Sequence, residues 1–342
     1  MMEVSPTPGP PLLTVAIPTY NRPKELRECV EYLRNQTDHR FHLLVIDNAS
    51  PTPASAVLDG LLEDFPALSF NVVRNRVNVG GDANVLRCFE LCETEYLWIL
   101  GDDDAPLPTA VETIHATLQE YPKALFVNFT CELHNRLAES TTSNLDEFIG
   151  SVDSFSNILF ASTSVFRVPE TAPHLRFAYR FSYAMAPHII LLLQALMRGP
   201  GTCYLSTRRI VRWTAPPDGT RWSIVAQLLG VGVLLDMPLS TENRRRLAQI
   251  LPRPQALECA TIQLMGHRLQ SGDFVRCRYL LDQLYFRLLR HSATFSMRVR
   301  FLIYRNVFMR FPGMGMSLFR TAIKLSGRGK DMLTIRDPDD QA

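Results

Sequence analysis

Short apolar runs alternate with longer segments of helical periodicity through the first 130 residues of the chain. The runs end at proline, glycine or charged residues, which is typical of buried strands. In the first longer segment Leu26, Cys29, Val30 and Leu33 recur at helical spacing and predict one buried face. The pattern predicts strands at 12–18, 42–46, 70–73, 96–100 and 125–130, and helices that start near 23 and cover 54–65, 82–92 and 108–120.

Strands that alternate with helices of about a dozen residues predict a three-layer α/β fold with a mostly parallel sheet and right-handed crossovers. Beyond the fifth strand the pattern weakens. Residues 131–150 are polar and predict a long loop, and 160–168 predict a strand that returns to the sheet. Residues 177–197 contain a helix, 204–211 predict another strand, and the chain is helical in pattern from about 223.

This pattern divides the chain into three expected regions. Residues 1–11 hold four prolines and no apolar core, so they predict a disordered lead-in rather than a signal peptide. Residues 12–238 form the α/β domain, and residues 239–342 form a helical, basic C-terminal region. No window reaches the ~18 uninterrupted apolar residues that a membrane span requires.

Polar clusters follow each of the first four strands and therefore converge on one edge of the sheet, where ligands bind in open α/β folds. They lie at 19–22, 47–50, 74–84 and 102–104. The last is three adjacent aspartates, which repel one another unless a cation is present. Mg²⁺ and Mn²⁺ prefer carboxylate oxygens, so the triplet predicts a divalent metal site. The alternative is a solvated acidic turn.

Two kinds of nucleotide site fit an acidic residue after the second strand. A dinucleotide site places Asp47 on a ribose but needs glycines after the first strand, and residues 18–23 contain none. The other is a nucleoside diphosphate site in which a metal, rather than glycines, holds the phosphates. There Asp102 and Asp104 carry the cation, Tyr20 stacks on the base and Asp47 accepts hydrogen bonds from base or ribose.

Four motifs carry a family resemblance. They are TVAIPTYNRPKELRECVEYL (14–33), LLVIDNAS (43–50), RNRVNVGGDANVLRCF (74–89) and YLWILGDDDAPLP (96–108). In this order and spacing they resemble the family 2 glycosyltransferases of GT-A fold, and most of all the abequosyltransferase-like branch of O-antigen enzymes. The resemblance covers roughly residues 12–235. It implies transfer of a sugar from a nucleotide-sugar to an acceptor hydroxyl, with Mg²⁺ or Mn²⁺ as cofactor.

The resemblance also assigns residues. It implies a metal at Asp102 and Asp104, with Asp104 as the direct ligand and Asp103 facing the ribose or donor sugar. Each of these residues also has a structural alternative. Tyr20 packs at the base of a loop, Asp47 only forms a turn, and Arg74 and Arg76 are solvated. The nucleotide-sugar contacts that it implies are Thr19, Tyr20, Arg22, Asp47, Arg74, Asn78, Gly80, Asp82, Asn84, Asp102 and Asp103.

One region departs from the family pattern. Many members carry Glu-Asp at a helix start after the sixth strand, with the Asp as base, but residues 181–189 contain no carboxylate. His188 lies there and titrates near neutrality, so it is expected to act as the catalytic base or as a further metal ligand. The alternative is a buried histidine at the start of an apolar helix. Residues 162–167 resemble a strand beside the acceptor site, or a plain edge strand.

Charge is distributed unevenly along the chain. The formal net charge is +2, yet residues 287–330 hold ten Lys and Arg and no Asp or Glu. Within this region, 297–330 mixes arginines with aromatic and aliphatic residues, which is typical of helices that lie on anionic membranes. The alternative is packing of the apolar face on the catalytic domain. No motif that reads nucleic acid is present.

Together with these residues, the resemblance implies a metal-dependent glycosyltransferase that acts on a lipid-linked glycan in cell-surface polysaccharide synthesis of the O-antigen type. Seven cysteines at irregular spacings, with no CxxC pair, predict reduced thiols and a cytoplasmic protein. The basic region predicts a peripheral position on the inner face of the cytoplasmic membrane. The rival interpretation is a non-catalytic nucleotide-sugar-binding or scaffold protein with a degenerate GT-A site.

Overall fold

The computed structural model describes residues 12–63, 69–131, 136–152, 155–212, 224–251, 264, 274–286, 295–303, 305–306 and 311. These residues belong to two compact units. The first lies within Met1–Ser151, Ser156–Ser182 and Pro187–Ala215, and the second within Val152–Phe155, Tyr183–Ala186 and Pro216–Ala342. The boundary expected near residue 238 stays a prediction. The expected lead-in at 1–11 lies outside the described residues.

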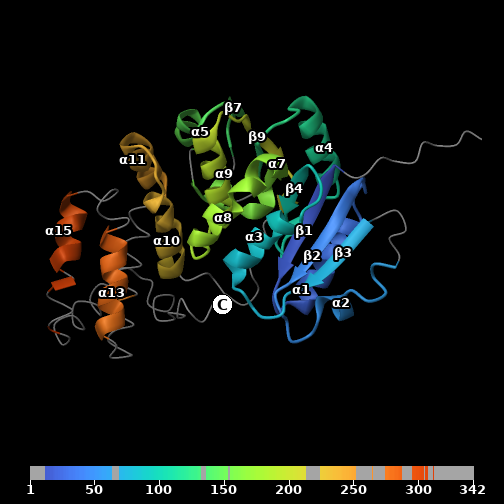
Figure 1. The fold of residues 1–342 in the computed structure, drawn as a ribbon, viewed down its shortest axis with the longest axis horizontal. Helices are drawn as coiled ribbons and strands as arrows, with labels where there is room; N and C mark the ends of the chain where they lie inside the picture. Colours follow the sequence, from blue (N-terminus) through green and yellow to red (C-terminus); the bar gives the residue numbers. More distant parts are fainter. Residues whose placement is uncertain are drawn as a thin grey trace, which may run out of the picture. The chain divides into compact units, whose positions relative to one another are not determined.

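An eight-stranded sheet is the centre of the first unit, as far as its residues are described (Figure 1). Its strand order is β3-β2-β1-β4-β8-β6-β9-β7, and only β8 and β7 run antiparallel to their neighbours. The prediction of a mostly parallel α/β sheet is therefore confirmed. The strands are β1 (Leu13–Thr19), β2 (Phe41–Asp47), β3 (Ser69–Arg74), β4 (Tyr96–Ile99), β6 (Phe126–Thr130), β7 (Ser140–Thr142), β8 (Ser164–Arg167) and β9 (Cys203–Arg209).

Strand register brings the expected polar clusters to one edge. In the parallel pair β1–β2, Thr19 is opposite Asp47, and in β2–β3 Asp47 is opposite Arg74. The backbone N–H of Leu100 donates to the carbonyl of Ala16 at 2.9 Å, so the chain after β4 leaves the sheet beside the end of β1. The aspartate triplet thus starts next to the loop that follows β1.

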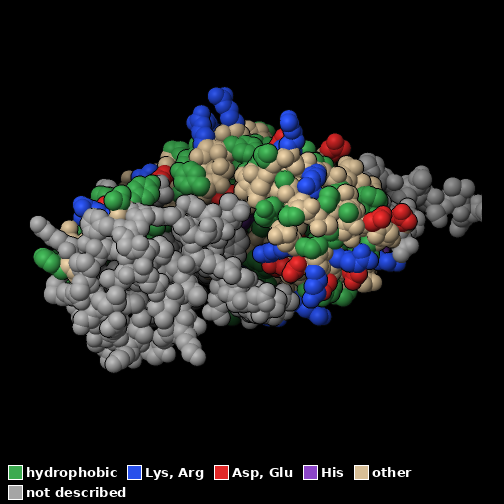
Figure 2. All heavy atoms as spheres, turned by 90° about the horizontal axis from the view of Figure 1, so that it is seen from below, with side chains coloured by type: hydrophobic (Ala, Val, Ile, Leu, Met, Phe, Trp, Pro, Cys, Tyr) green, Lys and Arg blue, Asp and Glu red, His purple; other side chains and the backbone are tan. Residues whose placement is uncertain are grey.

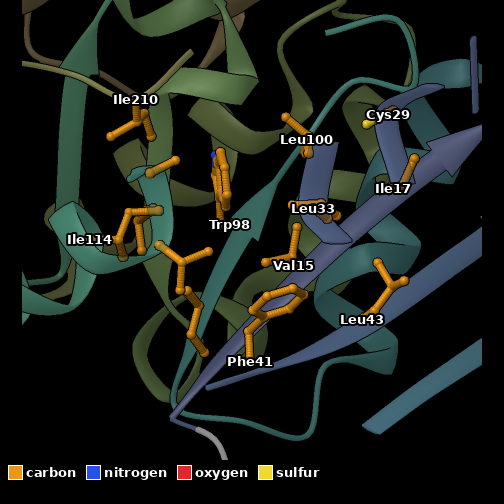
Figure 3. Close-up of a cluster of buried hydrophobic side chains, with 14 of the residues drawn as sticks. Val15, Ile17, Cys29, Leu33, Phe41, Leu43, Trp98, Leu100, Ile114 and Ile210 are labelled. Carbon is orange, nitrogen blue, oxygen red and sulfur yellow. The ribbon is translucent and has the colours of Figure 1, made fainter. Parts of the chain in front are cut away.

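One face of the sheet packs on α1 (Pro23–Arg34), α2 (Ala54–Val57) and α4 (Ala110–Glu120). Alternate strand residues point to this face, as the period of two along a strand requires. Buried side chains of this layer are labelled in Figure 3, with Trp98 fully buried between sheet and helices. They include Val15, Ile17, Cys29, Leu33, Phe41, Leu43, Leu100 and Ile114.

The opposite face is covered by α3 (Gly81–Leu91) and α9 (Pro187–Arg198). Phe166 of β8 meets Phe89 of α3 with ring centroids 5.2 Å apart, and it meets His188 of α9 at 6.0 Å. Edge-to-face contacts of this kind stabilise the packing beyond what the burial of apolar area contributes. The sheet is therefore the middle of three layers, as the sequence predicted.

Three local expectations are wrong. Residues 131–150 are not a simple loop, because β7 pairs with β9 at the sheet edge and α5 (Leu145–Ser151) buries Phe148 and Ile149. The helix expected at 54–65 is the single turn α2, since Gly60 takes a φ of +70° that a helix cannot accommodate. β8 begins only after a 3₁₀ turn, η1 (Ala161–Thr163), and lies between β4 and β6 rather than at an edge.

The remaining elements of the first unit are short. β5 (Ala105–Pro106) pairs with β10 (Val211–Arg212), and the helix expected within 177–197 is α9.

The described part of the second unit is helical, as predicted. Within the described residues no helix is long and apolar enough to cross a bilayer. The other helical elements are α6 (Phe155–Leu159), α7 (Val168–Thr171), η2 (Ala172–His174), α8 (Leu175–Ala178), η3 (Tyr179–Phe181), α10 (Ile224–Gly232), η4 (Val233–Asp236), α11 (Thr241–Ile250), α13 (Phe274–Leu284) and α15 (Phe295–Ile303).

Candidate active site

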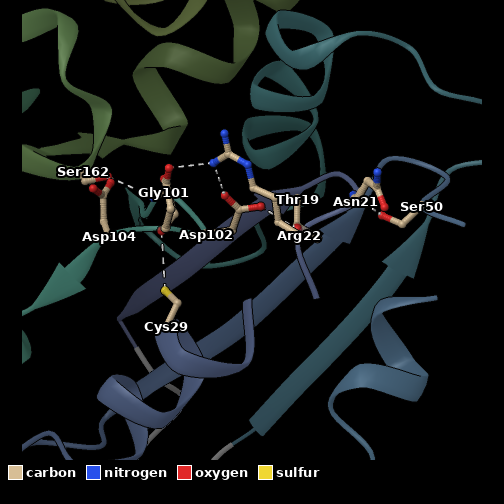
Figure 4. Close-up of polar contacts among 10 residues, drawn as sticks. Thr19, Asn21, Arg22, Cys29, Ser50, Gly101, Asp102, Asp104 and Ser162 are labelled. Carbon is tan, nitrogen blue, oxygen red and sulfur yellow. Dashed lines mark hydrogen bonds and ion pairs between the residues drawn. The ribbon is translucent and has the colours of Figure 1, made fainter. Parts of the chain in front are cut away.

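The aspartate triplet meets the loop after β1 at the carboxyl edge of the sheet (Figure 4). Thr19 Oγ1 donates to Asp102 Oδ2 at 2.7 Å, and Arg22 Nη1 donates to Asp102 Oδ1 at 3.1 Å. The same Arg22 nitrogen donates to Asp103 Oδ2 at 2.7 Å. Burial raises the pKa of Asp102 to about 6, although Arg22 and Thr19 act in the opposite direction. Both carboxylate oxygens of Asp102 thus already have partners within the protein.

Asp104 has a different environment. Its Oδ2 accepts a hydrogen bond of 2.5 Å from Ser162 Oγ, and no basic side chain of the described residues lies within ion-pair distance of it. Burial raises the pKa of Asp104 to about 7, the Ser162 hydroxyl lowers it, and the neighbouring carboxylates of Asp103 and Asp102 raise it further. Asp104 is therefore a partly buried carboxylate that lacks a positive partner.

These environments decide which carboxylate suits a cation. A divalent ion of the Mg²⁺ type binds through one or two carboxylates, substrate phosphates and water, so a closed protein cage is not required. Among the described residues no three His, Cys, Asp or Glu side chains converge into such a cage. Asp104 fits a direct ligand because one of its oxygens has no partner among the described residues, whereas Asp102 is bonded to Thr19 and Arg22.

Asp47 organises the loop after β2. Its side chain is 1% exposed, and it accepts bonds from the backbone N–H groups of Ser50 (2.8 Å) and Ala54 (3.1 Å). Arg74 Nη1 donates to its Oδ2 at 2.7 Å, so Arg74 is held by an ion pair although its side chain is 42% exposed. Burial raises the pKa of Asp47, but these hydrogen bonds and the Arg74 charge outweigh burial and hold the pKa below its usual value. Asp47 thus fixes the shape of this loop, as the turn alternative proposed, and its contact with a nucleotide stays a prediction.

Acid should weaken this loop, and an Asp47→Asn variant should reveal it. Because the pKa of Asp47 is lowered in the folded state, its contribution to stability is present above about pH 4, the value for an unfolded Asp, and is lost as pH falls further. Removal of the charge should lower the free energy of unfolding by about 1–3 kcal/mol at neutral pH. Denaturant unfolding of both proteins from pH 7 to pH 3 should show the difference shrinking in acid, and a constant difference would contradict this role.

Four asparagines connect the loops after β2 and β3. Asn48 Nδ2 donates to Asn78 Oδ1 at 2.7 Å, and Asn48 Oδ1 accepts from Asn75 Nδ2 at 2.9 Å. Asn75 also donates to Asn84 Oδ1, and Gly80 N donates to Asn78 Oδ1 at 2.8 Å. Gly80 has a φ of +85° just before α3, which glycine adopts without strain. The predicted residues Asn78, Gly80 and Asn84 therefore lie together, but Asn84 is buried and supports the loops.

Several predicted contacts lie at the surface of these loops. Tyr20 is 40% exposed, which leaves its ring available for stacking and does not support the alternative of a packed loop residue. Val77 and Val79, at 64% and 42% exposure, add apolar surface in the loop after β3. Asp82 lies in the first turn of α3, and Arg76 is exposed. The loops after β1 and β2 are joined by a 2.9 Å bond in which Asn21 N donates to Ser50 Oγ.

His188 lies apart from these loops. It is 3% exposed on α9, its ring packs on Phe166, and its Nε2 lies 3.3 Å from the carbonyl oxygen of Ile158. Its Nδ1 has no partner among the described residues. Burial lowers the pKa of His188 to about 4. The ring contacts Ile158 and Phe166, and this environment favours the buried-histidine alternative over the base or metal-ligand role.

Sequence reasoning gave no specific role to Asn48, Asn75 or Ser162. The two asparagines could have been identified from the sequence, because they lie inside the second and third motifs beside Asp47 and Arg74. Ser162 could not, since it lies 58 residues from Asp104 in the sequence. Only the pairing of β8 with β4 brings Ser162 next to Asp104.

Comparison with known proteins agrees with this geometry. Residues 14–166 match the model of glycosyl transferase family 2. Abequosyltransferase RfbV of Salmonella typhimurium is 34% identical over 98 residues, which are 28% of this chain and 28% of that protein. A GalNAc(5)-diNAcBac-PP-undecaprenol beta-1,3-glucosyltransferase of Campylobacter jejuni is 25% identical over 129 residues, 38% of this chain and 41% of that protein. The match thus spans less than half the length of these relatives.

The fold has solved counterparts. The structure of S. aureus TarS 1–349 in complex with UDP-GlcNAc superposes with a TM-score of 0.52 and 14% identity, covering 86% of this chain and 91% of that one. At this identity the likeness concerns the fold alone, and it confirms the GT-A architecture expected from the four motifs. The motif resemblance is confirmed too, because the matched stretch contains all four motifs. Residues 14–166 of this chain therefore form a domain of glycosyl transferase family 2.

Proposed function

We propose that this protein is a metal-dependent glycosyltransferase that moves a sugar from a nucleotide-sugar to an acceptor hydroxyl. The observation that carries the proposal is the asymmetry of the aspartate triplet. Asp102 is bonded to Thr19 and Arg22, while Asp104 is partly buried and forms no ion pair with a described residue. A partly buried carboxylate without an ion pair at the end of β4 suits a bound Mg²⁺ or Mn²⁺.

Each loop has a separate part in this proposal. Asp104 holds the metal, which when bound neutralises the charge of the diphosphate leaving group. Arg22 is 44% exposed beside Asp102 and Asp103, so its guanidinium can also reach phosphate oxygens. Tyr20 and the apolar loop after β3 offer surface for the nucleoside. Asp47 and the asparagines Asn48 and Asn75 keep these loops in place.

A thermal-shift panel of nucleotide-sugars, each with and without Mn²⁺, tests the proposal. A ligand that binds the folded state alone raises the Tm, so at least one donor should raise it in a Mn²⁺-dependent way. The rival interpretation, a non-catalytic binding protein, predicts the same shift with no transfer or hydrolysis in the presence of acceptor extracts. Absence of any Mn²⁺-dependent shift across the panel would contradict both.

We propose further that the acceptor is a lipid-linked glycan in cell-surface polysaccharide synthesis of the O-antigen type. Support comes from the relatives, one named for abequosyl transfer and one for glucosyl transfer to an undecaprenol-linked glycan. The basic region at 287–330 adds to it, because a lipid-borne acceptor requires the enzyme at a membrane. We therefore place the protein in the cytoplasm, peripheral on the inner face of the cytoplasmic membrane.

Most of residues 297–330 lies outside the described residues, but the flanking helices are consistent with this location. Val275 of α13 and Phe295 of α15 are 79% and 82% exposed, so both helices carry apolar side chains at the surface. On the face of the first unit that Figure 2 shows, basic and acidic side chains are interspersed. Residues 287–330, which hold Lys and Arg but no Asp or Glu, are therefore the part of the chain that suits an anionic surface.

Binding to anionic vesicles should follow from this charge. The intact protein should sediment with vesicles that contain acidic lipids at low salt and should be released at high salt, because screening weakens each contribution of about 1 kcal/mol per basic residue. Vesicles of neutral lipid are the control. A chain ending at Arg287 should lose the binding, whereas equal sedimentation of both chains would remove the hypothesis. Aggregation of the shorter chain would support packing on the catalytic domain.

A further inference from the structure

Ser162 connects a distant segment to the aspartate triplet. It lies in η1, just before β8, and is 2% exposed. Its Oγ accepts from the backbone N–H of Gly101 at 2.9 Å and lies 2.5 Å from Asp104 Oδ2. Its carbonyl oxygen accepts from Trp98 Nε1 at 2.8 Å. Three hydrogen bonds therefore connect this one residue to the stretch from Trp98 to Asp104. Figure 4 shows Ser162 beside Gly101 and Asp104.

The direction of these hydrogen bonds is determined. A serine hydroxyl has a single hydrogen, and its oxygen accepts the Gly101 N–H, so the hydrogen is free to point at Asp104. Asp104 Oδ2 is then the acceptor, and a donor hydrogen bond of this kind favours the charged carboxylate. The other oxygen, Oδ1, has no hydrogen-bond partner among the described residues.

The Asp104 carboxylate also lies close to Gly101. A Cβ on Gly101 would lie 2.5 Å from Asp104 Oδ2 and 3.2 Å from its Cγ, so the carboxylate folds closely over the glycine. Asp104 Oδ2 therefore lies between Gly101, whose missing Cβ makes room for it, and the Ser162 hydroxyl that donates to it.

We propose that Ser162 is a positioning residue for metal binding, which orients the Asp104 carboxylate so that its second oxygen faces the cation. The inference rests on the proposed function, because it assumes that Asp104 is a metal ligand. Residues that hydrogen-bond a metal ligand fix its orientation, and their removal typically weakens metal binding about 10–100-fold.

The test compares four variants with the intact wild-type chain. Each is titrated with Mn²⁺ in a fixed mixture of uridine, guanosine, cytidine, adenosine and thymidine diphosphates, and the rise in Tm gives an apparent Mn²⁺ affinity. Ser162→Ala should lower that affinity about 10–100-fold. Ser162→Cys fills the volume but donates weakly, so a similar loss there identifies the hydroxyl and not a cavity as the cause.

Ser164→Ala is the matched control. Ser164 is also fully buried and accepts a 3.1 Å bond from Asn128 Nδ2, but it has no bond to Asp104. It should lower the Tm of the free protein and leave the Mn²⁺ affinity unchanged. Wild-type affinity in both Ser162 variants, or an equal loss in Ser164→Ala, would overturn the positioning role. Asp104→Asn separates the two proposals, because unchanged Mn²⁺ affinity in that variant would refute the metal site itself.

Discussion

Replacement of Asp104 with asparagine is expected to abolish Mn²⁺-dependent donor binding and to lower turnover at least 10²–10³-fold. The amide keeps an oxygen that can accept the Ser162 hydroxyl but removes the charge that a cation needs. Because two neighbouring carboxylates no longer repel it, the variant should be as stable as wild type or slightly more stable. Donor binding by thermal shift, with and without Mn²⁺, and steady-state transfer measure the two effects.

Asp103→Asn is the matched control for this prediction. This substitution removes the same charge one position away. The Asp103 side chain, however, is 46% exposed, and its Oδ2 accepts a hydrogen bond from Arg22. Its loss should change donor affinity modestly and leave the Mn²⁺ dependence in place. If Asp104→Asn retains Mn²⁺-dependent binding while Asp103→Asn loses it, the two aspartates have been assigned the wrong way round.

The elements that could be predicted from sequence are those whose pattern is local. β1, β2 and β4 are continuous apolar runs, and the helix at Pro23–Arg34 has a regular apolar face. The observed ends lie close to the predicted ones, since β1 ends at Thr19, directly after Pro18, and β2 ends at Asp47. Convergence of the polar clusters then follows from parallel pairing alone, which is why Thr19, Asp47 and the triplet could be placed at one edge.

What could not be predicted depends on pairing between distant segments. β8 lies between β4 and β6, although the chain passes through β6, β7 and two helices before it returns. Periodicity contains no information on that insertion, so the contact between Ser162 and Asp104 was not foreseen. The short α2 has a local cause instead, because Gly60 takes a left-handed φ within an otherwise helical pattern.

His188 shows why a helix start is ambiguous in a sequence. Pro187 and the apolar run that follows predict the helix correctly, but every residue from Ile189 to Leu193 is buried, so no polar face identifies the exposed side. A histidine in the first turn can therefore face either the ligand edge or the sheet. In the structure it packs on Phe166 in the sheet.

Replacement of His188 with leucine is expected to leave turnover within about tenfold of wild type, against the 10²–10⁴-fold loss that removal of a general base causes. The larger effect should be on the pH dependence of stability. Burial lowers the pKa of His188 from 6.5 to about 4, so below pH 6.5 the unfolded chain binds the proton more readily than the folded one. Stability of wild type should therefore fall as pH drops from 6.5 to 4, by up to roughly 3 kcal/mol from this group.

His188→Leu should lack that part of the acid dependence, as measured by denaturant unfolding at intervals between pH 7 and pH 4. Gln194→Leu is the control, since Gln194 lies on the same helix, is 4% exposed and has an unpartnered Oε1, but does not titrate. It should keep the acid dependence of wild type. A loss of turnover of 10²-fold or more in His188→Leu, with donor affinity retained, would instead identify His188 as the base. Weakened Mn²⁺-dependent donor binding would instead place His188 at the metal site, as a ligand or as a residue that orients one.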